Sequence, residues 1–95
     1  MTLLQLKLFA VVAKHQNMTK ASREVHLSQS AISQQLKLLE KECGIKLFNK
    51  ASRGIKLTEA GCLFLPDVEL ILSQVERLKE KFNKTNIKKA SWESL

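Results

Sequence analysis

Residues 28–42, SQSAISQQLKLLEKE, constrain the fold more than any other stretch, because they read as one helix with two very different faces. At about 100° per residue, apolar side chains recur on one side of such a helix. These are Ile32, Leu36, Leu39 and Cys43. The opposite side carries Ser30, Ser33, Gln34, Lys37 and Lys41. The stretch therefore predicts an amphipathic helix whose apolar stripe packs against other elements.

The polar face of this helix has an unusual composition. Solvated helix faces favour Glu, Lys and Arg, whereas this face begins with hydroxyl and amide groups and then changes to lysine. Serine and glutamine can hydrogen-bond to base edges, and lysine can neutralise phosphate. Ser28 is a natural N-cap, so the helix would present its amide end outward. The helix alone leaves two interpretations equally open, a face that reads nucleic acid and an ordinary solvated face.

The charge balance of the whole chain favours a polyanionic partner. Sixteen Lys and Arg against nine Asp and Glu give the 95 residues a formal net charge of +7. Nucleic acid and an anionic membrane surface both fit such a balance. No apolar run approaches the roughly 20 residues that span a bilayer, and the N-terminus lacks the pattern of a secretory signal. We expect one small cytoplasmic domain, with an appended helix, that crosses no membrane.

The residues that usually carry metal or catalytic chemistry are scattered. Cys43 and Cys62 lack a Cys-x-x-Cys or Cys/His pattern, so we expect small buried or half-buried thiols in a reducing compartment. His15 and His26 are distant from any carboxylate or cysteine cluster. The sequence implies no metal and no cofactor. It shows no nucleophile–base set or glycine-rich phosphate loop, which makes an enzyme the weakest function class.

Two short helices are predicted before residue 28. Thr2 and Gln5 fit a capping box, so the first helix should begin near Leu3 and end in the polar segment 14–17. Its predicted buried face is Leu3, Leu6, Phe9, Ala10 and Ala13. We expect Thr19 to cap a second helix from Lys20 to Val25 or His26, with Ala21 facing inward. Two helices joined by a tight turn, the second with a polar outer face, form a helix-turn-helix pattern.

Residues 45–57 predict a small basic hairpin. Two apolar pieces, 47–48 and 55–57, flank the segment NKASRG, and Gly44 is placed to end the preceding helix. The hairpin carries Lys46, Lys50, Arg53 and Lys56 with no acidic residue. Beside a helix-turn-helix this is a wing, whose tip can follow the DNA backbone or place an arginine in a narrow minor groove. The alternative is a connecting turn with solvated charges.

A long amphipathic helix is predicted from Thr58, its N-cap, to about residue 83. Its apolar positions exceed what a small domain can cover, so we expect a second copy of the chain to cover part of them. These positions are Leu65, Val68, Ile71, Leu72, Val75, Leu78 and Phe82. Pro66 favours a bend near Cys62, with two separate helices as the alternative. Residues 84–95 read as a linker or tail.

The blocks of residues in this order resemble the N-terminal DNA-binding region of LysR-type transcriptional regulators. The matching segments are LxxLxxF at 3–9, MTxAS at 18–22, LSQSAIS at 27–33, LxE at 38–40, GxxLF at 44–48 and RGIxLTEAG at 53–61. They cover roughly residues 2–66, and their combination is highly specific. The resemblance implies a mainly α fold: a winged helix-turn-helix of three helices and a two-stranded wing over residues 1–57, then a dimerising linker helix over 58–83.

The resemblance also assigns roles to residues. It implies that the start of the third helix reads bases through Gln29, Ser30, Ser33 and Gln34. Relatives commonly have arginine at the position of Gln34, and glutamine there suits adenine better than guanine. Contacts to the DNA backbone and the wing contacts are assigned to Thr19, Ser28, Lys37, Lys50, Arg53 and Lys56.

Two functional hypotheses follow. The first is a sequence-specific DNA-binding module of a bacterial transcriptional regulator, in which a homodimer reads an inverted repeat of double-stranded DNA. The second is an interaction module that pairs with a full-length relative and inactivates it. Family members normally continue into a domain that binds a small-molecule inducer, so we expect this chain to be an excised fragment, with a naturally short relative as the alternative. In both cases we expect no inducer site in this chain. A higher oligomer would belong to a full-length protein.

Overall fold

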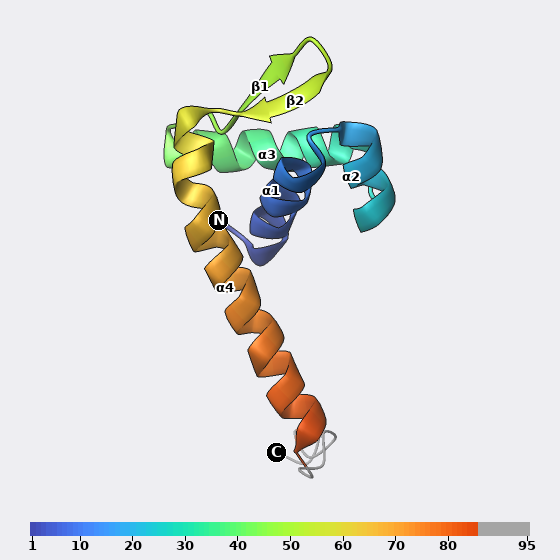
Figure 1. Ribbon diagram of the computed structural model, residues 1–95, viewed down its shortest axis with the longest axis vertical. Coiled ribbons are helices and arrows are strands. Elements are labelled where there is room, and N and C mark those ends of the chain that lie inside the picture. Colours follow the sequence, from blue (N-terminus) through green and yellow to red (C-terminus); the bar gives the residue numbers. More distant parts are fainter. Residues whose placement is uncertain (86–95) are drawn as a thin grey trace.

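The computed structural model describes residues 1–85 as four helices and one hairpin (Figure 1). Helices α1 (Leu3–His15), α2 (Met18–Val25) and α3 (Gln29–Cys43) form the helical body. Strands β1 (Phe48–Ala51) and β2 (Gly54–Leu57) pair antiparallel, with Phe48 opposite Leu57 and Ala51 opposite Gly54. Helix α4 (Glu59–Lys84) follows. The mainly α winged helix-turn-helix fold is thus confirmed, whereas residues 86–95 of the predicted tail lie outside the described part.

Local capping sets where each of the four described helices begins, and three of the caps are those that the sequence predicts. Thr2 and Gln5 form the predicted capping box at α1, Ser28 accepts from the Ala31 amide at α3, and Thr58 accepts from the Gly61 amide at α4. Each cap satisfies an amide that has no partner within its helix. The predicted cap of α2 is wrong. Asn17, whose side chain accepts from the Lys20 amide at 2.9 Å, caps it, and Thr19 lies in its first turn.

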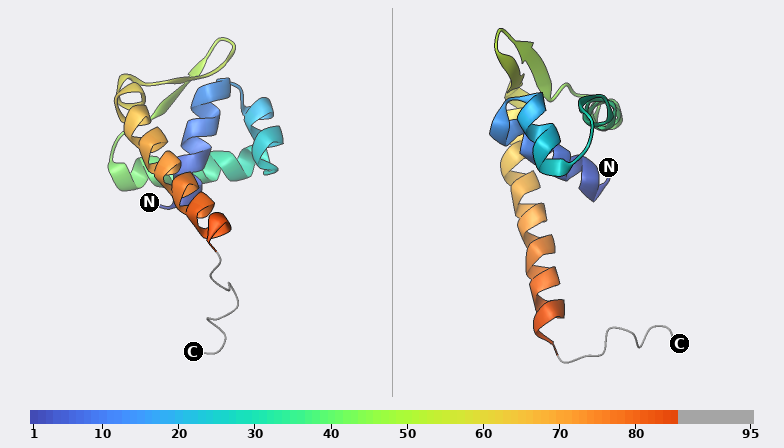
Figure 2. Two further views of the ribbon diagram at one scale, coloured as in Figure 1. Left: turned by 60° about the horizontal axis from the view of Figure 1, so that its bottom comes forward. Right: turned by 90° about the vertical axis from the view of Figure 1, so that its right-hand side faces the viewer.

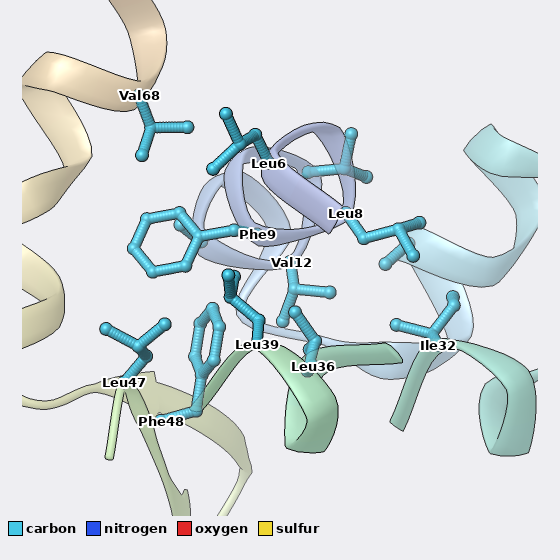
Figure 3. Packing of buried hydrophobic residues seen from close by; sticks show 13 residues of the cluster. Leu6, Leu8, Phe9, Val12, Ile32, Leu36, Leu39, Leu47, Phe48 and Val68 are labelled. Carbon is cyan, nitrogen blue, oxygen red and sulfur yellow. The ribbon is translucent and has the colours of Figure 1, made fainter. Parts of the chain in front are cut away.

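The hydrophobic core lies where α1, α3, the start of the wing and α4 meet (Figure 3). Its largest fully buried side chains are Leu8, Phe9, Val12, Ile32 and Leu39. The rings of Phe9 and Phe48 pack at 5.4 Å between centroids, which joins the wing to α1. Figure 1 shows α2 near the N-terminal end of α3, and the right-hand view of Figure 2 shows α3 beside the hairpin and α1 rather than between them. The arrangement leaves the outer face of α3 uncovered beside the wing.

Several burial predictions are wrong. Leu3 is exposed, whereas Leu6, Phe9 and Val12 of the same helix face the core. The first turn of α1, which contains Leu3, extends past the core. Cys43 and Cys62 are exposed as well, Cys43 as the last residue of α3 and Cys62 in the first turn of α4. Ala10 is only partly buried.

Helix α4 is one continuous helix of 26 residues with Pro66 inside it, so the alternative of two helices is wrong. At 1.5 Å per residue it extends for about 39 Å. Its first turns pack on the core through Val68, while its C-terminal half projects away from the other elements in Figure 1 and in the right-hand view of Figure 2. The projecting half is therefore available to another molecule. A bend near Cys62 stays a prediction.

Candidate nucleic-acid interface

The exposed surface at the start of α3 contains the four residues predicted to read bases. Gln29, Ser30 and Gln34 are exposed and Ser33 is half-buried, and all lie in the first two turns of α3. Positions four apart lie almost above one another on a helix, so Gln29 aligns with Ser33 and Ser30 with Gln34. The structure therefore gathers the four side chains on one strip of surface.

The N-terminal ends of α2 and α3 are joined by side chains. The Gln29 amide nitrogen donates to the Thr19 hydroxyl oxygen at 3.1 Å. The Ser28 hydroxyl lies 3.3 Å from that of Ser30, in addition to capping α3. A second link forms within the turn, where the Ser22 hydroxyl donates to the carbonyl oxygen of Leu27. The two helix ends thus present hydroxyl and amide groups in a fixed relation.

The wing is attached to the helical body at both ends. The Glu40 carboxylate of α3 accepts from the backbone amides of Leu47 at 2.6 Å and Phe48 at 3.2 Å. On the second strand, the Ile55 amide donates to the carbonyl oxygen of Gln16 at 3.3 Å. These bonds fix the hairpin beside α3. The sequence interpretation missed Glu40 as an anchor, because its bonds reach amides seven and eight residues further along the chain, beyond the end of α3.

The register of the hairpin decides which wing cations lie near α3. Lys50 is paired with Ile55, and paired residues project from the same face of a sheet. Ile55 packs against the core, so Lys50 lies on the face of the hairpin that is turned toward the helical body. There a groove of about 180 Å³ separates α3 from the wing. Ser33, Lys37 and Lys50 line this groove, together with Met18, Leu36, Glu40, Lys46, Phe48, Asn49 and Ile55. Lys46 and Asn49 are groove residues that the sequence assignment had left out.

The two remaining wing cations lie elsewhere. Arg53 is exposed in the turn between the strands. Lys56 follows Ile55 on β2, and it is not among the residues that line the groove. The structure therefore brings Lys37 and Lys50 together at the groove but does not bring Lys56 to it.

The positive charge of this surface is not neutralised within residues 1–85. The ion pairs of the described chain lie elsewhere and leave Lys37, Lys50, Arg53 and Lys56 without an acidic partner. Glu24 of α2 pairs with two residues of α1 instead, Lys14 at 2.7 Å and His15 at 2.8 Å. These hydrogen bonds, first that from Lys14, lower the pKa of the Glu24 carboxyl. The candidate interface is therefore strongly cationic at neutral pH.

The apolar face predicted on α4 divides into two parts. Val68 is 8% exposed and belongs to the chain's own core, so it offers little surface to a partner, and its assignment to dimerisation stays a prediction. Leu65 and Leu72 are partly buried against the same core. Leu70, which the assignment lacked, is exposed, as are Leu63 and Phe64. The exposed predicted positions are Ile71, Leu78 and Phe82, with Val75 half-buried.

Two features are absent from residues 1–85, a membrane-spanning helix and a metal-binding cluster. No helix in this range is long and apolar enough to cross a membrane. Within the same range, no three His, Cys, Asp or Glu side chains are grouped so that they could hold a metal ion.

Comparisons with known proteins give a consistent result. Residues 3–62 match the family described as "Bacterial regulatory helix-turn-helix protein, lysR family". The chain is 39% identical over 83 residues to a carbapenem-hydrolyzing beta-lactamase transcriptional activator of Enterobacter cloacae, covering 87% of this chain and 28% of the relative. It is 41% identical over 81 residues to the regulator BudR of Klebsiella aerogenes, covering 85% of this chain and 57% of BudR. The chain thus spans only part of these relatives.

Solved structures agree with the sequence matches. The crystal structure of the CbnR_DBD–DNA complex superposes with a TM-score of 0.79 at 38% identity, covering 87% of this chain and 95% of that one. The BenM_DBD/catB site 1 DNA complex gives a TM-score of 0.83 at 32% identity, covering 88% and 94%. Fold, motif order and the extent of the match agree, and the chain belongs to the lysR family of bacterial regulatory helix-turn-helix proteins.

Proposed function

We propose that this chain binds double-stranded DNA sequence-specifically, as the DNA-binding module of a LysR-type transcriptional regulator. The observation that carries the proposal is the strip of Gln29, Ser30, Ser33 and Gln34 on the uncovered face of α3, next to cations that have no acidic partner within residues 1–85. Such groups can hydrogen-bond to base edges in the major groove. Two relatives of the same fold were solved in complex with DNA.

In this mechanism the backbone contacts and the base contacts come from different elements. Helix α3 enters the major groove, while Lys37 and Lys50 at the groove beside the wing neutralise phosphates. Arg53 at the wing turn approaches the minor groove. Thr19, Ser28 and Lys56 complete the proposed backbone contacts. The chain's role is binding, with no catalytic step, and a bacterial regulator of this kind acts in the cytoplasm.

The projecting α4 supplies the proposed dimer contact. Ile71, Leu78 and Phe82 form an exposed apolar stripe at helical spacing, with Leu78 53% and Phe82 59% exposed. Burying such a stripe against a second copy removes apolar surface from water. A symmetric dimer then requires an inverted repeat in the DNA. Residues 1–57 would read DNA, residues 58–83 would pair, and any higher oligomer would need the rest of a full-length regulator.

Selection from a random duplex library tests the proposal. The purified 95-residue chain would be bound at near-physiological salt, and the retained duplexes sequenced. We expect an enriched inverted repeat whose half-sites lie about one helical turn apart. Gln29→Ala and Ser33→Ala should each change the enriched sequence. Retention without enrichment would contradict sequence-specific reading, because charge alone gives binding of that kind.

A further inference from the structure

Gln29 is the first residue of α3 and its side chain is exposed, yet it is not free in the structure. Its amide nitrogen donates to the hydroxyl oxygen of Thr19, which lies in the first turn of α2. The two residues are separated by ten positions, so the bond crosses from one helix of the helix-turn-helix to the other. An exposed glutamine otherwise samples many rotamers, and binding must then restrict it.

The bond leaves the recognition groups of the glutamine available. The Gln29 amide nitrogen has two hydrogens, and Thr19 takes one of them. The second N–H and the carbonyl oxygen stay open, and these are the donor and acceptor that pair with adenine N7 and N6. Because the amide nitrogen of Gln29 faces Thr19, the bond also fixes the orientation of the amide. The positions of its free N–H donor and its carbonyl acceptor are therefore set.

Thr19 is suited to hold another group in place. Its β-branched side chain has few rotamers in a helix. Its hydroxyl accepts from Gln29 and keeps its own hydrogen, which can be donated to a phosphate oxygen. One side chain can therefore join a backbone contact to a base contact.

We propose that Thr19 is a positioning residue that presets the Gln29 amide for reading adenine. The inference rests on the proposed DNA-binding function and adds to it a residue that sets specificity without contacting a base. Since Thr19 is exposed and outside the core, its substitution leaves the fold intact.

The test compares Thr19→Val, which keeps the shape but removes the acceptor, with Thr19→Ser, which keeps the acceptor. Discrimination is the ratio of affinities for the selected site and for the same site with the Gln29-dependent base pair replaced. Gln29→Ala, which identifies that base pair, should lower the ratio by about 5- to 150-fold, the range for one bidentate pair. Thr19→Val should lower it about 2- to 12-fold at that base pair, the cost of one freed side chain, and Thr19→Ser should retain most of it.

The double variant separates positioning from a phosphate contact. In the Gln29→Ala background, Thr19→Val should cause no further loss of discrimination at that base pair. An equal loss of affinity for every sequence, with the ratio unchanged, would mean that Thr19 contacts phosphate alone and would overturn the inference. So would a further loss of discrimination in the double variant.

A measurement without DNA keeps the inference testable if the library selection enriches nothing, an outcome that counts against the proposed function. Side-chain amide order parameters from NMR report how restricted the Gln29 amide is in the free chain. We expect the order parameter of Gln29 to fall in Thr19→Val and not in Thr19→Ser, with the exposed Gln34 amide as the internal reference. An unchanged Gln29 value in Thr19→Val would show that Thr19 does not hold it.

Discussion

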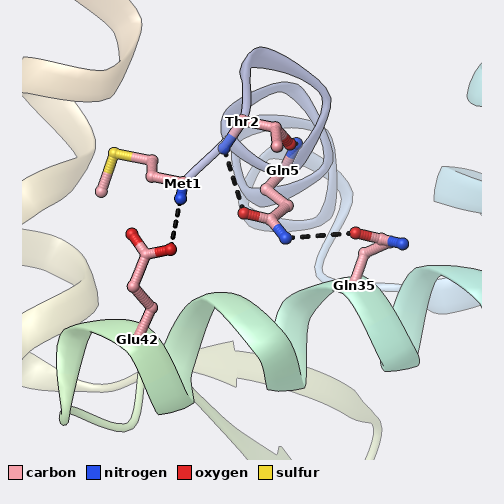
Figure 4. Close-up of polar contacts among 5 residues, drawn as sticks. All are labelled: Met1, Thr2, Gln5, Gln35 and Glu42. Atoms are coloured by element: carbon pink, nitrogen blue, oxygen red, sulfur yellow. Dashed lines mark hydrogen bonds and ion pairs between the residues drawn. The ribbon is translucent and has the colours of Figure 1, made fainter.

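Gln5 shows how one side chain can join two elements. It is buried, and its amide oxygen accepts from the Thr2 backbone amide at 3.1 Å, while its amide nitrogen donates to the Gln35 side chain of α3 at 3.2 Å (Figure 4). The amino group of Met1 pairs with the Glu42 carboxylate on the same helix. A buried polar group is tolerated when its hydrogen bonds are made. Gln5 therefore fixes the start of α1 against α3.

Gly54 occupies a position that only glycine fits. Its φ is +97°, and a Cβ there would overlap the carbonyl oxygen of Gln16. We expect Gly54→Ala to lower the free energy of unfolding by about 2–6 kcal/mol, from backbone strain and overlap together. Gly44 is the matched control, since its φ is +69° but nothing lies within 4 Å of an added Cβ. Gly44→Ala should cost only about 1–2 kcal/mol. Equal losses for both in urea denaturation would contradict the close approach.

Glu40 should matter more to the fold than its sequence neighbour Glu42. Its carboxylate accepts two backbone amides at the entry to the wing. Removing it leaves both without that partner, so Glu40→Ala should cost about 2–4 kcal/mol in thermal or urea unfolding. Glu42→Ala removes only an exposed ion pair and should cost less than about 1 kcal/mol. Comparable effects of the two variants would show that the wing does not depend on this anchor.

At the scale of elements, the wing and α3 act as one cationic surface. Lys50 lies at the groove between them, with no acidic partner within residues 1–85. Lys50→Ala should weaken binding to all DNA sequences alike and reduce the slope of log K against log salt by about 1. Lys81→Ala, on the projecting part of α4, is the control and should leave that slope unchanged. A change in base preference with Lys50→Ala would instead assign the residue to base reading.

At the scale of the whole molecule, the exposed stripe of α4 should determine the oligomeric state. Leu78→Glu places a charge on the stripe, far from the core, and should shift the chain from dimer to monomer in sedimentation while its helical content is kept. Ser73→Glu introduces the same charge at another exposed position of α4 and should leave the dimer intact. If Leu78→Glu stayed dimeric, pairing would have to use another surface.

Features that depend on a few neighbouring residues were predictable from the amino-acid sequence. Thr2, Ser28 and Thr58 cap their helices as expected, and Gly44 adopts the left-handed conformation at the end of α3. These signals are local, because a cap bonds to an amide only two or three residues away. The basic hairpin and the polar strip of α3 were equally readable from residue type and spacing.

Which side of each apolar pattern is covered depends on how the elements pack together. Periodicity shows that Leu3, Val68 and Leu78 are apolar positions on helices but not which element lies opposite them. In the folded chain Leu3 is exposed, Val68 is buried, and Leu78 projects outward. The register that turns Lys50 toward α3, and the approach of Thr19 to Gln29, likewise depend on contacts between residues distant in sequence. Burial and long-range pairing are properties of the packed arrangement, and no local pattern specifies them.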